Sequence, residues 1–115
     1  MQYINITMGI TKTAFFTSNQ NQLANLAKAL ANPARIAIIE YLLKVDSCIC
    51  GDIVTELPLA QPTISQHLKE LKNAGIIQGN IEGNSICYCL NTDTLQILQS
   101  FFSKIITKVN KNKCC

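Results

Sequence analysis

The chain has 115 residues, of which 48% are hydrophobic and 15% charged, so its composition is that of one globular domain and not of a disordered protein. Its longest uninterrupted apolar run, 86–90, is far too short to cross a membrane, and no export signal opens the chain, so we expect a cytoplasmic protein. The formal net charge of +3 is compatible with a nucleic-acid partner but does not identify one.

The first third of the chain predicts an arm followed by two helices. Residues 1–17 show no clean hydrophobic period and are expected to form a flexible N-terminal arm. From 18 to 31, leucines and alanines recur at helical spacing. Asn32-Pro33 ends that helix, and Pro33 is suited to open the next, which we expect to reach Leu43.

Residues 48–73 are expected to form two helices separated by a turn at 58–60. In the second helix, 61–73, Pro62 occupies a first-turn position that needs no N–H, and Ile64, Leu68 and Leu71 form one apolar stripe. The opposite face is polar without being strongly charged, which is typical of the second helix of a helix-turn-helix. A plain amphipathic surface helix would show the same stripe, so the neighbouring elements decide between the two.

The last third predicts a hairpin and a long helix. Residues 76–90 have the alternation and the turn, 82–84, of a β-hairpin. The helix expected over 92–109 is apolar on a surface broader than one small core can cover, which favours a homodimer through the terminal helices. Residues 111–115 form a tail ending in two cysteines. The expected dimer contacts are Leu95, Leu98, Phe102 and Ile105.

Elements in this order predict a mainly α fold with a small β-hairpin, the winged helix-turn-helix. The expected domain spans 18–110, with the helix-turn-helix at 48–73 and the wing at 76–90. Four segments resemble the ArsR/SmtB family of metal-responsive repressors: ALANPARIAIIEYLL (29–43), SCICGDIV (47–54), LAQPTISQHLKELKNAGII (59–77) and EGNSICYCL (82–90). The resemblance implies a homodimer that occupies an inverted-repeat operator in double-stranded DNA and leaves it when an inducer binds.

The resemblance also implies that the polar face of helix 61–73 contacts the operator. Amide side chains such as that of Gln66 can pair with adenine, and hydroxyl groups can serve bases or phosphates. His67 is the only histidine and is expected at a base edge or phosphate, because a lone imidazole makes a poor metal site. The expected DNA-contacting residues are Gln61, Thr63, Ser65, Gln66, His67, Lys69 and Lys72. The wing tip, 78–84, has no Lys or Arg, unlike the wings usual in the family, which weighs against a wing contact to phosphate.

The six cysteines occur as three close pairs, 48/50, 87/89 and 114/115. Cys48 and Cys50 match the family's cysteine motif at the start of the first helix of the helix-turn-helix. Residues two apart in a helix point to nearly opposite sides, so both sulfurs can bind one ion only if the first turn is unwound or Cys48 lies outside the helix. We call helix 61–73, which is expected to contact DNA, the reading helix. We therefore expect metal binding at Cys48 and Cys50 to shift the reading helix and lower the protein's affinity for DNA.

Thiolate ligands without nitrogen or carboxylate partners favour trivalent arsenic or antimony as the inducer, with Cd, Pb and Zn as alternatives. The resemblance implies no organic cofactor. Cys114 and Cys115 are the expected source of further metal-binding thiols. Cys87 and Cys89 are interpreted as small residues that fill strand positions, with a second thiol site as the alternative.

Three other functions stay open or are disfavoured. A redox or persulfide sensor of the same fold would join Cys48 or Cys50 to Cys114 or Cys115. A DNA-binding protein with no inducer would leave the cysteines incidental. An enzyme is not expected, because the chain has neither a Cys-x-x-Cys before a helix nor a Cys with a histidine base.

Overall fold

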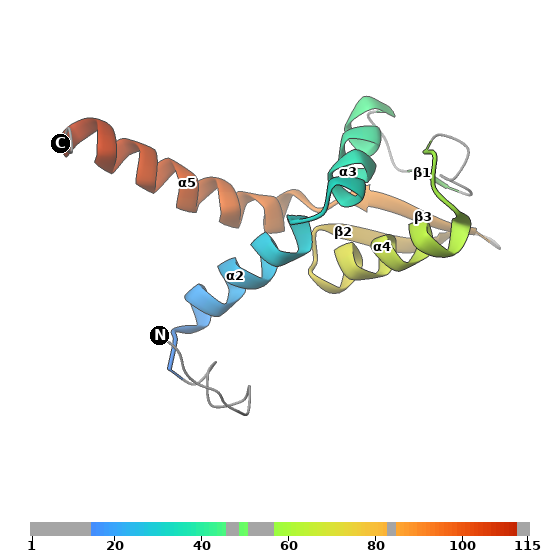
Figure 1. Cartoon of the computed structure of the whole chain (residues 1–115), viewed down its shortest axis with the longest axis horizontal. Coiled ribbons are helices and arrows are strands. Elements are labelled where there is room, and N and C mark those ends of the chain that lie inside the picture. Colours follow the sequence, from blue (N-terminus) through green and yellow to red (C-terminus); the bar gives the residue numbers. More distant parts are fainter. Residues whose placement is uncertain (1–14, 46–48, 51–56, 83–84, 113–115) are drawn as a thin grey trace.

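The computed structural model describes residues 15–45, 49–50, 57–82 and 85–112, and most of the predicted arm, 1–14, lies outside them. The elements in chain order are α2 (Ser18–Leu30), α3 (Pro33–Val45), β1 (Ile49–Cys50), α4 (Gln61–Asn73), β2 (Ile77–Glu82), β3 (Ser85–Leu90) and α5 (Thr92–Asn112). Figure 1 shows α4 beside the hairpin of β2 and β3, while α5 leads away from the body. Helices with a small antiparallel hairpin confirm the predicted fold class.

The two helices predicted in the first third form where local signals place them. Thr17 makes a capping box with Gln20: its Oγ1 accepts from the Gln20 N–H at 3.0 Å, and its own N–H donates to Gln20 Oε1 at 2.9 Å. Before α3, Asn32 Oδ1 accepts from the Ala34 N–H at 2.8 Å, and Pro33 occupies the first helical position. The predicted end of the first helix at Asn32-Pro33 is thereby confirmed.

The helix α4 ends in a hydrogen-bonded turn centred on Gly75. The Ile76 N–H donates to the Leu71 carbonyl at 3.0 Å, and the Gly75 N–H donates to the Lys72 carbonyl at 2.9 Å. This is the Schellman arrangement, which needs a left-handed residue, and Gly75 has a φ of 82°. The Asn91 N–H donates to the Ile76 carbonyl at 2.9 Å, so the same turn also anchors the start of α5.

The sheet contains a strand that the sequence did not predict. Its order is β1-β3-β2, and all pairs are antiparallel. Ile49 lies opposite Tyr88 and Cys50 opposite Cys87. The helix expected to begin at Cys48 is therefore wrong at 49–50, which are extended, while 51–56 lie outside the described residues. The physical reason is that β3 would otherwise leave backbone groups unpaired along one edge, and this short segment pairs with them.

The core lies where α2, α3 and α4 meet one face of the hairpin. Its fully buried side chains are Ile38, Ile64, Leu71, Ile76 and Ile77. Together with Leu68, two of them form the predicted apolar stripe of α4, which is confirmed. No helix in the described part of the chain is long and apolar enough to span a bilayer.

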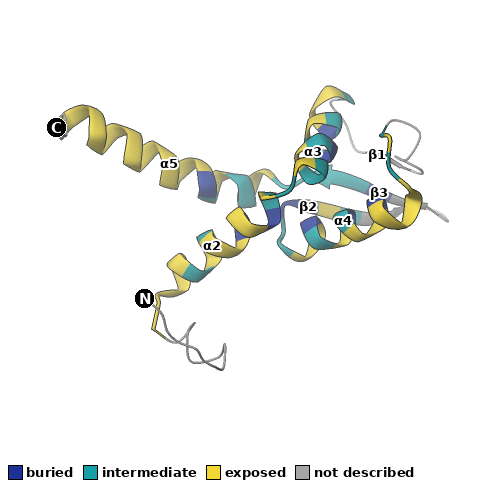
Figure 2. Cartoon of the chain, in the orientation of Figure 1, coloured by how far each residue is buried: buried dark blue, intermediate teal, exposed yellow. Residues whose placement is uncertain are grey.

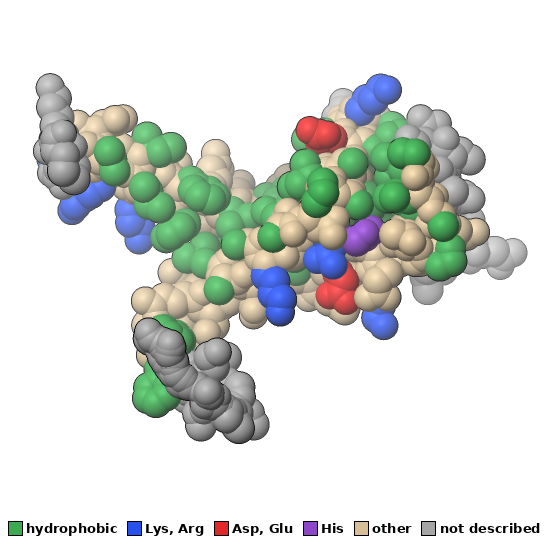
Figure 3. All heavy atoms as spheres, viewed as in Figure 1, with side chains coloured by type: hydrophobic (Ala, Val, Ile, Leu, Met, Phe, Trp, Pro, Cys, Tyr) green, Lys and Arg blue, Asp and Glu red, His purple; other side chains and the backbone are tan. Residues whose placement is uncertain are grey.

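The start of α5 belongs to this core, but most of the helix does not. Leu98 is 8% exposed and packs in the core cluster, and Leu95 packs against it. Beyond residue 98 the helix is exposed along its whole described length (Figure 2). Figure 3 shows hydrophobic side chains running along this projecting helix. Its apolar face therefore continues past the point where the rest of the chain can cover it.

Candidate nucleic-acid interface and thiol groups

The polar face of α4 is held outward by its buried stripe. Ile64, Leu68 and Leu71 are at most 7% exposed, which fixes the rotation of the helix about its own axis. Of the residues expected to contact DNA, Gln61, Thr63, Ser65, Gln66, Lys69 and Lys72 are all exposed. The structure thus brings six of the seven predicted side chains onto one accessible helix, where no other described element covers them.

His67 differs from the other six because it is partly buried and bonded within the chain. Arg35 of α3 donates from Nε to His67 Nδ1 at 3.1 Å, and its Nη1 donates to the Ala29 carbonyl at 3.2 Å. Arg35 therefore ties α4 to α3 and to the last turns of α2. The sequence gives no local signal for this positioning residue, since a hydrogen bond between distant segments leaves no local pattern. A DNA contact by His67 stays a prediction.

Two other side chains on this helix also have neighbours within the chain. The Gln66 amide nitrogen donates to Glu70 Oε2 at 3.0 Å, so its pairing with a base would require it to leave that carboxylate. Lys72 reaches β2: its Nζ lies 3.4 Å from the position that a Cβ on Gly79 would take. The last turn of α4 is in this way connected to the wing strand.

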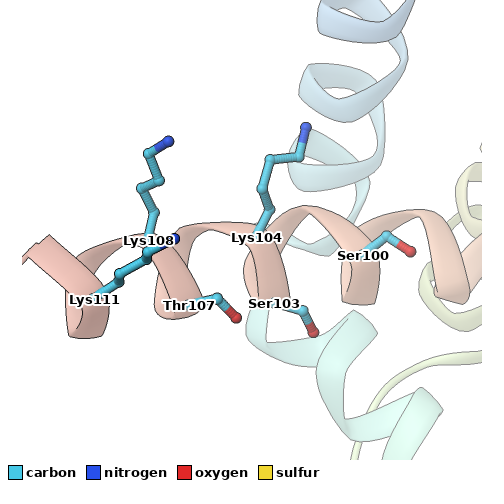
Figure 4. Close-up of a pocket in the computed structure, with 6 residues that line it drawn as sticks. All are labelled: Ser100, Ser103, Lys104, Thr107, Lys108 and Lys111. Atoms are coloured by element: carbon cyan, nitrogen blue, oxygen red, sulfur yellow. The ribbon is translucent and has the colours of Figure 1, made fainter.

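A second group of basic residues lies on α5 (Figure 4). They line a shallow hollow formed by Ser100, Ser103, Lys104, Thr107, Lys108 and Lys111. Lys104 and Lys108 project in the same direction from the helix, whereas Ser103 and Thr107 project to another side. All six residues belong to one helix, so the hollow is open surface and not an enclosed binding cavity. Because α5 leads away from α4, these lysines are remote from the predicted reading face.

The structure places three of the six cysteines. Cys50 is on β1, and Cys87 and Cys89 are on β3, where Cys87 is 3% exposed and Cys89 is half-buried. Cys87 and Cys89 are both disulfide-bonded. The other predicted metal ligands, Cys48, Cys114 and Cys115, lie outside the described residues. Among the side chains that the structure describes, no three His, Cys, Asp or Glu groups are arranged to hold a metal ion.

Residues 32–78 match the family model described as bacterial regulatory protein, arsR family. The transcriptional repressor SdpR of Bacillus subtilis (strain 168) is 37% identical over 84 residues, which cover 73% of this chain and 92% of that protein. The chain belongs to the ArsR family. The arsenical resistance operon repressor of Staphylococcus xylosus is 30% identical over 77 residues, covering 67% of this chain and 73% of that one.

A solved ArsR-like transcriptional regulator from Rhodococcus sp. RHA1 has the same fold, with a TM-score of 0.71 at 21% identity over 84% of this chain and 90% of that one. The resemblance to the ArsR/SmtB family is thus confirmed. This ArsR-family chain is a transcriptional repressor of a metal-sensing family and not an enzyme.

Proposed function

We propose that this ArsR-family repressor acts in the cytoplasm as a homodimer that binds an inverted-repeat operator and releases it when trivalent arsenic or antimony binds cysteine thiolates. The observation that carries the DNA-binding part is the exposed polar face of α4 above a fully buried apolar stripe. Short polar side chains on a helix of this kind can reach base edges in the major groove. The hydrogen bonds that Arg35 donates to His67 and to the Ala29 carbonyl hold that helix in one orientation.

The homodimer is supported by the uncovered apolar face of α5. Phe102 is 55% exposed and Ile105 42% exposed, as expected for contacts to a second copy, whereas Leu95 and Leu98 are already packed within their own chain. The side chains left for a partner are Phe101, Phe102, Ile105, Ile106 and Val109. A two-fold axis through this face would present two copies of α4 to half-sites about one or two helical turns apart.

The inducer part is supported by the chemistry of the cysteines. Thiolates select soft ions, and trivalent arsenic is satisfied by sulfur alone, with Cd, Pb and Zn as alternatives. Because Cys50 is on β1, the ion would not act by unwinding a helix at that residue. In our proposal it acts through β1, which precedes α4 in the chain and is paired to the wing.

A second candidate is a repressor that senses an oxidant or a persulfide. The observation that favours it is that Cys87 and Cys89 are disulfide-bonded. A disulfide can form and break by exchange with small thiols, so it can report the redox state of the cell.

The test measures operator binding by fluorescence anisotropy on the DNA upstream of the gene, using the fully reduced full-length chain. Arsenite, antimonite, cadmium and zinc are added in turn, and oxidised glutathione is added in a separate series. We expect arsenite to weaken binding at least about tenfold, about 1.4 kcal/mol. The Gln66→Ala variant, which keeps the fold, should bind operator weakly from the start. If no ion changes the anisotropy while oxidised glutathione does, the redox sensor replaces the metalloid sensor.

A further inference from the structure

The middle of the polar face of α4 holds an amide that is hydrogen-bonded to a carboxylate. Gln66 lies two residues after Ile64 and two before Leu68, so it is on the side of the helix away from the buried stripe, and it is exposed. One turn later Glu70 is partly exposed, and its Oε2 accepts from Gln66 Nε2 at 3.0 Å. Residues four apart are neighbours on a helix surface, so α4 forms this pair by itself. A carboxylate thus lies beside the amide that is proposed to contact a base.

The charge of Glu70 sets it apart from the other side chains of this face. It is the only acidic residue of α4, whose remaining polar residues are neutral or basic. DNA phosphates repel a carboxylate, so the charge by itself weakens binding to every DNA sequence. Base edges in the major groove do not act alike: cytosine N4 and adenine N6 donate, whereas guanine O6 and N7 and thymine O4 accept. A carboxylate on this face can therefore distinguish one base from another.

The hydrogen bond makes the two side chains dependent on each other during DNA binding. When the Gln66 amide leaves to pair with adenine, the Glu70 carboxylate loses its donor. A charged acceptor left unpaired at a desolvated interface costs more free energy than a neutral one. The N4 amino group of a cytosine can replace the lost donor, whereas guanine or thymine presents another acceptor. Four helical residues rise about 6 Å and successive bases of one strand lie about 3.4 Å apart, so the two side chains reach bases one or two steps apart.

We propose that Glu70 is a specificity-determining residue of the operator contact. Its carboxylate accepts from the N4 amino group of a cytosine that lies within two base steps of the adenine paired with Gln66, and it disfavours guanine or thymine at that position. In the free chain the Gln66–Glu70 hydrogen bond satisfies both groups, and in the complex each group takes a base as its partner. The inference rests on the proposed function, because it requires the polar face of α4 to lie in the major groove.

The test selects duplexes from a randomised DNA library with the reduced full-length chain and with the variants Gln66→Ala, Glu70→Ala and Glu70→Gln. Loss of an adenine preference in Gln66→Ala identifies the base that Gln66 contacts. Fluorescence anisotropy then measures the dissociation constants of duplexes that carry each of the four bases at the positions one and two steps away. We expect the wild type to prefer cytosine over guanine at one of these positions at least about fivefold.

The variants separate the hydrogen-bonding role of Glu70 from its charge. Glu70→Ala should lose the preference for cytosine, and Glu70→Gln should accept cytosine and guanine alike, because an amide both accepts and donates. The matched control is Glu40→Gln, which removes the same charge from an exposed position on α3 and should leave every base preference unchanged. Alanine and glutamine are good helix formers, so α4 should be retained, and circular dichroism checks this for each variant.

The same measurements separate this inference from the proposed function. If Glu70→Ala binds all duplexes more tightly by one common factor and keeps the wild-type base preferences, the carboxylate acts only through its charge and the inference is wrong. The proposed function then stands, provided that Gln66→Ala still loses an adenine preference. If neither Gln66→Ala nor Glu70→Ala changes any base preference, α4 does not read the operator, and the DNA-contact part of the proposed function is wrong as well.

Discussion

Arg35 of α3 donates a hydrogen bond from Nε to Nδ1 of His67 on α4, with 3.1 Å between the nitrogens. The same guanidinium donates to the carbonyl of Ala29 at 3.2 Å, so one side chain connects the reading helix to two supporting helices. Because His67 accepts at Nδ1, its Nε2 carries the proton in the neutral ring. This nitrogen is the donor that the proposed DNA contact of His67 would use.

The Arg35–His67 bond should appear as a coupling energy. We expect Arg35→Ala and His67→Ala each to lower the free energy of unfolding by about 1 kcal/mol, and the double variant to lower it by less than the sum. Urea denaturation of the four proteins gives the coupling, expected at about 0.5–1.5 kcal/mol. Strict additivity would show that the contact contributes nothing to stability. Lys69→Ala, on the exposed face of the same helix, is the control and should leave stability unchanged.

Of the two glycines in the described part of the chain, Gly75 should tolerate a side chain less well than Gly79. Its φ of 82° is unfavourable for any residue with a Cβ, and a Cβ there would lie 3.3 Å from Thr94 Oγ1. We expect Gly75→Ala to cost about 1–2 kcal/mol in the free energy of unfolding. The matched control is Gly79→Ala on β2, where the nearest atoms lie at 3.4 Å and φ is not positive. Equal thermal shifts in the two variants would contradict this account of the turn.

The parts of the fold that the sequence could predict depend on local chemistry. The bounds of α4, Gln61–Asn73, follow from Pro62 at its start and the Ala74-Gly75 stop, and both signals lie within a few residues of the helix end. The hairpin is likewise read from alternation on either side of one turn. Such signals depend only on residues that are close in the sequence, so they need no contact with a distant segment.

The parts that could not be predicted depend on distant partners. Ile49–Cys50 forms a strand only because β3, nearly forty residues later, offers an edge to pair with. In the sequence, the same two residues belong to the cysteine motif that the family resemblance places at the start of a helix. The placement of Cys50 beside Cys87 and the hydrogen bond of Arg35 to His67 have the same origin. No periodicity within one segment encodes either contact.

The exposed face of α5 should control the oligomeric state. Phe102 is 55% exposed, and a charge at this position would have to be desolvated in a helix–helix interface. We expect Phe102→Asp to raise the dimer dissociation constant at least about tenfold, measured by sedimentation equilibrium. Ser103→Asp adds the same charge on the polar side of the helix and is the matched control. A variant Phe102→Asp that remains dimeric at wild-type strength would place the interface elsewhere.

The lysines of α4 and α5 should differ in their effect on salt dependence. Lys69 is exposed on the predicted reading helix, whereas Lys108 projects from the remote end of α5. Each phosphate contact releases about one counterion, so Lys69→Ala in a dimer should reduce the slope of log Kobs against log salt concentration by about 2. Lys108→Ala should leave the slope unchanged. Anisotropy titrations on one operator at several salt concentrations measure both slopes. An unchanged slope for Lys69→Ala would mean that this side chain stays solvated in the complex. A reduced slope for Lys108→Ala would mean that α5 approaches the DNA backbone.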